Sequence, residues 1–263
     1  LQSSTMSSNL AQDEGGAIAN FGVSATVNVT DSTLSGNEAK FFGGGIENFN
    51  GRVFITDSTL HMNSSDVEGG GVFNTFSMLN QPVLTVTRST FSENESGLGG
   101  GIFTSEKVDI ISSTFVGNRA TQGAGVWKEG LELNVTNSTF SGNIAVEEGG
   151  GIYNDDFDVT IVSSTFSDNS GGDGGALFNF GTANVTNSIL ANSVAGGDCD
   201  GPESADLFAM GVNFDTDGTC KTAAADSATG DAFNTATAGE LNLDVLALNA
   251  PGQTMTHALL ENS

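Results

Sequence analysis

The sequence predicts an all-β fold, a single-stranded right-handed parallel β-helix of about seven to eight coils with about 25 residues per coil. Three short phrases recur in a fixed order along most of the 263 residues, and each unit of coil length contains one copy of each phrase. A unit of this size cannot bury its own apolar side chains, whereas stacked units bury them in one continuous core.

The first phrase, Ser-Thr-(Phe/Leu/Met)-x-x-Asn, predicts a short strand followed by a corner at which asparagine tolerates left-handed backbone. Its copies are Ser4–Asn9, Ser32–Asn37, Ser58–Asn63, Ser89–Asn94, Ser113–Asn118, Ser138–Asn143 and Ser164–Asn169, with a shortened copy at Ser188–Asn192. Successive asparagines lie 28, 26, 31, 24, 25, 26 and 23 residues apart.

Because equivalent residues of stacked coils lie one strand spacing apart, the first phrase also predicts two interior columns, one apolar and one of hydrogen-bonded asparagines. The apolar stack contains Met6, Leu34, Leu60, Phe91, Phe115, Phe140, Phe166 and Leu190. The asparagine ladder contains Asn9, Asn37, Asn63, Asn94, Asn118, Asn143, Asn169 and Asn192.

The second phrase is Gly-(Gly/Ala)-(Gly/Ala) followed by an aliphatic residue, five or six residues after each of the first seven asparagines. Glycine fits a sharp corner or a close approach between coils, where a β-carbon would clash. The aliphatic residues predict a second interior stack of Ile18, Ile46, Val72, Ile102, Val126, Ile152 and Leu177. The third phrase alternates apolar and polar residues, as in Val27 and Val29, and predicts a strand.

Two regions depart from the repeat. The 31-residue interval carries an extra segment, Ser77–Pro82, which predicts a protruding loop. We expect a β-helix over residues 1–194, followed by irregular terminal coils and a cap over 195–263. The chain begins inside a repeat, which favours a processed or partial chain.

Composition limits the partners. Seven basic residues and 32 acidic residues give a net charge of −25, which repels nucleic acid and anionic membranes. No stretch approaches the roughly 18 apolar residues that a membrane-spanning helix needs, so we expect no membrane insertion. Cys199 and Cys220 lie in neither a C-x-x-C nor a histidine-paired arrangement, and in an extracellular protein they favour a structural disulfide.

The pairing of Phe-x-x-Asn with Gly-Gly-(Ala/Gly)-(Ile/Leu/Val) resembles the repeat of chlamydial polymorphic outer-membrane proteins. The C-terminal part, with Ser188–Asn192, Asp198-Cys199 and Gly211–Phe214, resembles bacterial surface proteins of the choice-of-anchor type. Both resemblances imply a β-helix at the cell surface, and the first implies adhesion. A β-helix is a scaffold for many tasks, so the resemblance alone does not fix the function.

Two alternatives involve chemistry. Glycoside hydrolysis needs two carboxylates about 5–10 Å apart, and Asp155, Asp156 and Asp158 are candidates, but basic, histidine and tyrosine side chains are few and do not cluster. We therefore expect no catalytic residues. Calcium could bind acidic connectors such as Glu147 and Glu148, although neither a glycine-aspartate nonapeptide nor a full EF-hand loop is present and a solvated acidic edge explains them better. No cofactor and no metal site is predicted, with calcium as the alternative.

An aromatic stripe follows the glycine phrase in five coils, at Phe73, Phe103, Trp127, Tyr153 and Phe178, and is typical of packing between coils. The predicted function is thus an extracellular structural or adhesive β-helix that self-associates end to end into a fibre or surface layer. A surface glycan or a host-cell receptor is the other partner that this location allows. A carbohydrate-active β-helix and a calcium-stabilised scaffold are the alternatives.

Overall fold

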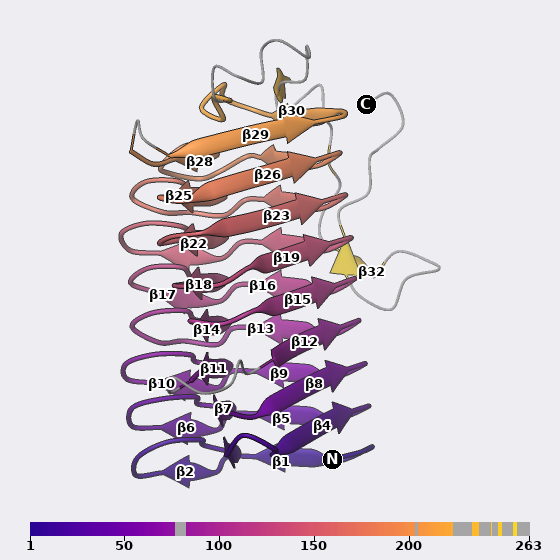
Figure 1. Cartoon of the computed structure of the whole chain (residues 1–263), viewed down its shortest axis with the longest axis vertical. Helices are drawn as coiled ribbons and strands as arrows, with labels where there is room; N and C mark the ends of the chain where they lie inside the picture. The colour runs from indigo at the N-terminus through magenta and orange to yellow at the C-terminus, as the bar shows by residue number, and fades with distance from the viewer. Residues whose placement is uncertain are drawn as a thin grey trace.

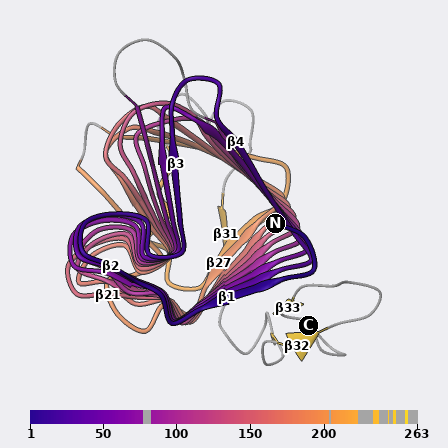
Figure 2. The same cartoon turned by 90° about the horizontal axis from the view of Figure 1, so that it is seen from below.

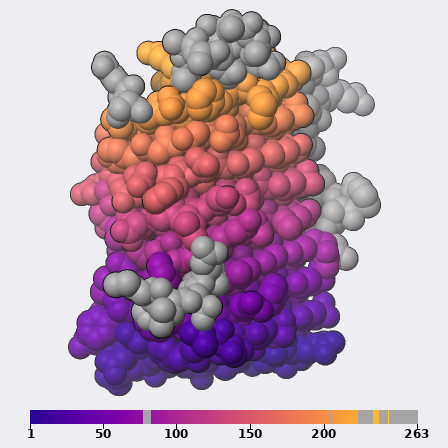
Figure 3. Space-filling model, in the orientation of Figure 1, coloured from indigo at the N-terminus to yellow at the C-terminus, as the bar shows by residue number. Residues whose placement is uncertain are grey.

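The computed structural model describes residues 1–76, 83–202, 205–222 and 233–236, together with residues 243, 247–248 and 255–256. Within this part of the chain every element is a strand, and the strands of successive coils pair in parallel to form three long sheets. Figure 1 shows the coils stacked along one axis, and Figure 3 shows them as successive bands of a continuous rod. The predicted loop Ser77–Pro82 lies outside the described residues.

The first sheet is built from the Ser-Thr-Phe phrases. It contains β1 (Thr5–Ser7), β5 (Thr33–Ser35), β9 (Thr59–His61), β13 (Thr90–Ser92), β16 (Thr114–Val116), β20 (Thr139–Ser141), β24 (Thr165–Ser167), β27 (Ile189–Ala191), β30 (Asn213–Asp215) and β31 (Phe233–Thr235). The pairing is in register, so Phe91 lies beside Phe115 and Phe115 beside Phe140. From β1 to β27 the middle residue of each strand points into the core, whereas in β30 Asp215 pairs with the core residue Leu190.

The second sheet follows the glycine phrases. It contains β3 (Ile18–Phe21), β7 (Ile46–Phe49), β11 (Val72–Thr75), β14 (Ile102–Thr104), β18 (Val126–Lys128), β22 (Ile152–Asn154), β25 (Leu177–Asn179) and β28 (Cys199–Asp200). The third sheet contains β4 (Thr26–Thr30), β8 (Arg52–Thr56), β12 (Val83–Thr87), β15 (Val108–Ile111), β19 (Leu133–Thr136), β23 (Asp158–Val162), β26 (Thr182–Thr186) and β29 (Asp206–Met210).

These pairings confirm the predicted parallel β-helix. In Figure 1 the near strands of the third sheet run to the right while the chain climbs from the N-terminus, so the helix is right-handed. The three sheets continue beyond residue 194 through β28, β29, β30 and β31. The sheets therefore extend beyond the point at which the repeat sequence is lost. No helix among the described residues is long and apolar enough to cross a bilayer.

A side lobe lies between the first and second sheets of each coil. Figure 2 shows it beside β3, with the lobes of successive coils superimposed. Its short strands form two small sheets, one with β2 (Leu10–Ala11), β6 (Glu38–Ala39) and β10 (Ser64–Ser65), the other with β17 (Arg119–Ala120) and β21 (Ile144–Ala145). Towards the C-terminus, β32 (Ala247–Leu248) and β33 (Met255–Thr256) form a separate antiparallel pair.

The core is one column of apolar side chains from all three sheets. Its largest fully buried members are the four phenylalanines of the first sheet, Phe91, Phe115, Phe140 and Phe166. Their rings stack with centroids 4.6–4.7 Å apart and interplanar angles of 4–12°. This separation equals the spacing between paired strands, so the backbone register itself sets the ring stacking.

Candidate functional site

The asparagine ladder occupies the corner where the first sheet meets the side lobe. The side-chain amides of Asn9, Asn37, Asn63, Asn94, Asn118, Asn143 and Asn169 each pass a hydrogen bond to the next, with Nδ2–Oδ1 distances of 2.8–3.0 Å. Each Oδ1 also accepts the backbone N–H of the preceding ladder member, as in Asn94 to Asn118 at 3.0 Å. The second amide hydrogen goes to a backbone carbonyl, that of Phe91 for Asn118. Every polar atom of the buried amides from Asn37 to Asn143 in this ladder is thus used.

Two details of the predicted corner are wrong. The left-handed residue is not the asparagine but the one before it, for example Glu93 at φ 53° and Asp168 at φ 59°. The ladder also does not pass through Asn192. Val194 donates its N–H to the backbone carbonyl of Asn169, the bond made in other coils by the residue that follows the ladder position. The ladder position in that coil is therefore Ser193. The shortened phrase has lost one residue of the strand–corner spacing, so Asn192 occupies the left-handed position at φ 57°.

A second polar ladder, which the sequence analysis did not identify, is formed by the serine that opens each Ser-Thr-Phe phrase. The backbone N–H of each serine donates to the Oγ of the serine one coil further on, at 3.1–3.2 Å from Ser4 to Ser188. In each coil from Ser4 to Ser188 the Oγ in turn donates to the carbonyl two residues earlier, as from Ser89 to Thr87. The invariant serine of the phrase therefore has a structural role.

A third ladder, also missed, lies at the corner between the second and third sheets. It comprises Asn20, Asn48, Asn74, Thr104, Lys128, Asn154 and Asn179, each two residues after the aliphatic residue of the glycine phrase. Amide-to-amide bonds of 2.7 Å join Asn20, Asn48 and Asn74, and another joins Asn154 to Asn179. Lys128 replaces an asparagine in this ladder, and its side chain is fully buried.

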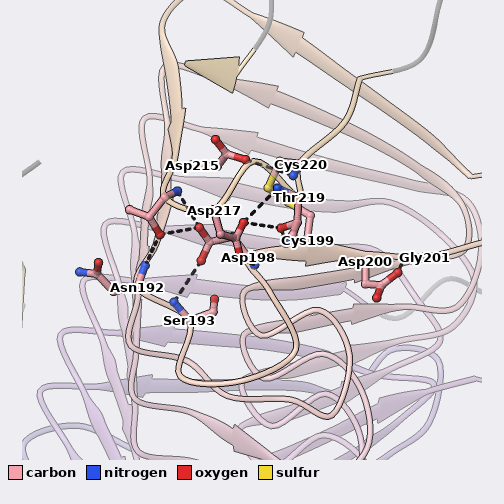
Figure 4. The surroundings of a disulfide bond; sticks show 11 residues. Asn192, Ser193, Asp198, Cys199, Asp200, Gly201, Asp215, Asp217, Thr219 and Cys220 are labelled. Carbon is pink, nitrogen blue, oxygen red and sulfur yellow. Dashed lines mark hydrogen bonds between the residues drawn. A yellow bond between two sulfur atoms is a disulfide. The ribbon is translucent and has the colours of Figure 1, made fainter. Parts of the chain in front are cut away.

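The predicted disulfide joins Cys199 to Cys220 near the C-terminal end of the rod. Beside it the buried carboxylate of Asp198 accepts the N–H of Ser193 and both the N–H and the Oγ1 hydrogen of Thr216, at 2.7–3.0 Å (Figure 4). Asp217 accepts the N–H of Asp198. These bonds replace the asparagine ladder where the repeat decays.

The aromatic stripe lies on the outer face of the second sheet and is covered by the side lobe. Phe73, Phe103, Trp127, Tyr153 and Phe178 are each less than one-tenth exposed, and Phe42 and Leu98 of the lobe pack against them. Neighbouring rings stack with centroids 4.7–5.6 Å apart at angles of 5–20°. The ring faces therefore cover one another, and the stripe forms a second core instead of a platform open to ligands.

The first glycine of each phrase brings the lobe onto this stripe. Gly123 and Gly149 have φ of +62° and +67°, in the left-handed region that favours glycine. A β-carbon on Gly123 would lie 2.6 Å from the Cα and Cβ of Trp127, and one on Gly149 would lie 2.7 Å from the Cβ of Tyr153. The predicted sharp corner is therefore present at the first glycine, whereas the predicted close approach between coils occurs at the third, as at Gly125, where a β-carbon would meet the carbonyl oxygen of Gly151.

Two acidic side chains are buried against the second sheet. Glu47 occupies the stripe position before Phe73, is 2% exposed and leaves its Oε2 without a hydrogen-bond partner. Burial, together with the carboxyl group of Glu14, raises the pKa of Glu47 to about 8. Glu106, which follows β14, is 1% exposed, and burial raises its pKa to about 7. Both carboxyl groups therefore bind protons at mildly acidic pH.

The other acidic candidates do not converge. Asp155 and Asp156 lie in the turn between β22 and β23, where Asp155 accepts the Tyr153 hydroxyl hydrogen at 3.4 Å and Asp156 accepts the N–H of Phe157. Among the described residues no group of three or more acidic, histidine or cysteine side chains is placed to hold a metal ion. The described chain thus offers structural ladders, a covered aromatic core and isolated buried ionisable groups.

The folded protein is expected to lose stability as pH rises from about 4.5 to 8. The folded-state pKa values of Glu47 and Glu106 lie above the unfolded value of 4.5. Their contribution is therefore complete below pH 4.5 and is lost as pH rises through about 7 and 8. Urea unfolding at pH 5 and at pH 8.5 measures how much the free energy of unfolding falls between these two pH values. This fall should be smaller for Glu47→Gln than for the wild type by at least about 2 kcal/mol.

Glu38→Gln is the matched control for this prediction, because Glu38 is exposed on β6. General repulsion within the acidic chain also weakens as pH falls, and Glu38→Gln removes one charge without touching the buried carboxyl groups. The assignment to Glu47 is wrong if Glu47→Gln and Glu38→Gln retain the same pH dependence as the wild type.

Comparison with known families gives one match. Residues 137–155, which run from the end of β19 through β20 and β21 into β22, match the family described as Chlamydia polymorphic membrane protein (Chlamydia_PMP) repeat. No curated protein and no solved structure matches this chain significantly. The matched copy contains both the Ser-Thr-Phe and the glycine phrase, so the predicted resemblance to these repeats is confirmed. The resemblance to choice-of-anchor proteins remains a prediction.

The repeat match and the fold together indicate a β-helix protein of the surface type. The repeat family is associated with the bacterial outer surface, and the Cys199–Cys220 bond is typical of an oxidising compartment.

Proposed function

We propose that this chain is an extracellular structural and adhesive β-helix whose first coil accepts a further coil of the same repeat, so that copies associate end to end. The observation that carries the proposal is the edge of the first coil. β1, β3 and β4 each stand at the end of their sheet. An unpaired strand edge is a template for another strand, and residues 1–3 cover only part of β4.

Apolar side chains of the first coil support this proposal. Met6, Ile18 and Val27 pack against the core but remain partly exposed. Their equivalents one coil further on, Leu34, Ile46 and Val53, are completely buried. A stacked coil would remove the remaining apolar area from water, which is worth roughly 25 cal/mol per Å².

The polar ladder supports the same geometry. Asn9 gives its amide hydrogen to Asn37, and no described residue donates to its Oδ1. An asparagine of an added coil would occupy that position in the way that Asn9 serves Asn37. The net charge of −25 opposes contact between the long sides of two rods. Association is therefore expected at the ends.

Electron microscopy and sedimentation over a range of protein concentrations test this proposal. We expect linear, end-to-end particles that lengthen with concentration. Ala19→Pro should block them, because Ile18 and Gly22 donate their N–H groups to the next coil and the alternation of a parallel strand then turns the Ala19 N–H towards the free edge. Ala19→Ser keeps this N–H and is the matched control. Monodisperse short rods at every concentration would overturn the proposal.

For a structural and adhesive protein, we expect no turnover of polysaccharide by this chain. A screen of acidic and neutral polysaccharides separates the two functions. Turnover that disappears in Asp156→Asn would favour the carbohydrate-active alternative, whose carboxylates would lie in the turn after β22. A large fall in melting temperature on adding a chelator would favour the calcium-stabilised scaffold.

A further inference from the structure

Lys128 is an exception within a repeating structure. Its register partners on either side are Thr104 and Asn154, and five of the seven positions of its ladder are asparagine. A buried ammonium group is costly unless it is paired with an opposite charge. Neither of the two salt bridges among the described residues involves Lys128. An amine in this position needs another way to lose its charge.

The Lys128 amine donates to one side-chain amide and to one backbone carbonyl. The Nζ of Lys128 lies 3.0 Å from the Oδ1 of Asn154, and it also donates to the backbone carbonyl of Asp156. The Nδ2 of Asn154 points the other way, to the Oδ1 of Asn179 at 2.7 Å and to the carbonyl of Phe157 at 3.2 Å. Both Lys128 and Asn154 are 0% exposed. The amine and the carboxamide are thus held together out of contact with bulk solvent.

We propose that Lys128 and Asn154 condense to form an isopeptide bond between two consecutive coils. The lone pair of the neutral Nζ attacks the Cγ of Asn154, and the new C–N bond moves the carbonyl π electrons onto Oδ1. One Nζ proton passes to Nδ2, the carbonyl re-forms, and the Cγ–Nδ2 bond breaks to release ammonia. No oxidant or reductant takes part, and the products are one secondary amide and one ammonia.

The surroundings supply what this reaction needs. Burial lowers the pKa of Lys128 to about 8, against the opposing field of Asp156, Asp158 and Asp155, so neutral amine is available near neutral pH. These three carboxylates lie in and just after the turn that follows Asn154, and their negative field acts on the amine. Holding amine and amide at fixed separation converts a slow bimolecular reaction into an intramolecular one.

The bond would link β18 covalently to β22, between residues 26 positions apart in the sequence. It would replace one hydrogen bond of the ladder by a covalent bond. It would also remove the buried charge. A cross-link between coils limits how far the rod can uncoil under load, in addition to the disulfide at the C-terminal end. The inference concerns the interior of one chain and does not depend on end-to-end association.

Intact-mass spectrometry of the purified chain tests the proposal. After reduction of the Cys199–Cys220 disulfide, we expect the wild type to be lighter than its sequence by one ammonia. A digest with glutamyl endopeptidase, which separates the two segments at Glu129 and Glu148, should contain a branched peptide that joins the segment around Lys128 to the segment around Asn154. Lys128→Asn restores the residue that the ladder uses elsewhere, so it should fold and show its full sequence mass. Asn154→Gln retains an amide but displaces it, and its mass should also be complete.

Asparagine followed by glycine can lose ammonia by forming a succinimide, and Asn50-Gly51 is such a pair. Loss of ammonia by that route would persist in Lys128→Asn and would map to the peptide that contains Asn50. The variants Lys128→Asn and Asn154→Gln therefore distinguish the two reactions. A wild-type mass equal to the sequence mass after prolonged incubation of the folded protein would overturn the proposal. Lys128 would then be only a hydrogen-bonding member of its ladder.

Discussion

Asn118→Leu is expected to lower the free energy of unfolding by about 3–6 kcal/mol. Leucine fills a similar volume but removes the Oδ1 that accepts the N–H and the Nδ2 hydrogen of Asn94. It also removes the donor to the carbonyl of Phe91. Three buried polar groups lose their partners, and each orphaned group costs about 1–3 kcal/mol. Equilibrium urea unfolding followed by circular dichroism measures the loss.

Asn9→Leu is the matched control at the end of the same ladder. Asn9 is exposed, and its side chain donates one hydrogen bond, to the Oδ1 of Asn37. In Asn9→Leu that Oδ1 still accepts the backbone N–H of residue 9. We expect a loss below about 1 kcal/mol. If the two substitutions cost the same, the ladder does not stabilise the corner through its amide chain, and the asparagines are conserved along the chain for another reason.

The fold could be predicted from the sequence because every coil repeats the same pattern of apolar, polar and glycine residues. Six of the seven full Ser-Thr-Phe phrases have one apolar residue between two polar ones, with Val116 as the exception, and seven consecutive copies fix both the strand and its register. Phe91 and Phe115 stack because their phrases stack. The interior asparagines follow from the same register. A periodic sequence therefore determines the long-range pairing that a single strand leaves open.

The ladder through Lys128 was missed although a signal was present. The residue two places after the aliphatic position is asparagine in five coils, as at Asn48 and Asn154, and threonine or lysine in the other two. Period-two alternation predicts only that this residue points inward. That a polar residue is tolerated there depends on the corner between two sheets, where a stacked amide finds partners in both neighbouring coils.

Two features depended on geometry beyond the repeat. The burial of Trp127 and Tyr153 requires the side lobe to fold back onto the second sheet, whereas alternation alone would leave them on an open outer face. The replacement of Asn192 by Ser193 in the ladder depends on one residue missing from the corner. An alignment of phrases cannot show this, because asparagine remains in the phrase while its place in the coil changes.

The third glycine of the phrase predicts the second large effect. Gly125→Ala is expected to destabilise the protein by about 3 kcal/mol or more. A β-carbon there would collide with the carbonyl oxygen of Gly151 and would lie 2.9 Å from the Cδ1 of Phe140. The same relation holds for Gly71 with Phe91, Gly101 with Phe115 and Gly151 with Phe166, at 2.9–3.1 Å. Thermal and urea unfolding measure the cost.

Gly142→Asp is the control for glycine replacement itself. Gly142 has φ +61° but no neighbouring atom within 4 Å of a β-carbon, and the equivalent position one coil further on is Asp168 at φ 59°. The chain already places aspartate in this conformation, so we expect a change below about 1 kcal/mol. A comparable loss in Gly142→Asp and Gly125→Ala would mean that backbone freedom, and not the collision, dominates.

The size of the facing residue sharpens this argument. Where the chain itself carries alanine at the third position, at Ala17 and Ala176, the first-sheet residue that follows is Leu34 or Leu190 and not phenylalanine. A smaller side chain therefore gives the β-carbon room. Phe140→Leu should cost about 1–2 kcal/mol alone, and Gly125→Ala with Phe140→Leu should cost less than the sum of the two single variants by at least about 1 kcal/mol. If the costs in this double-mutant cycle are strictly additive, the ring of Phe140 contributes nothing to the cost of the added β-carbon. Glycine would then be required at position 125 only by the close backbone of the next coil.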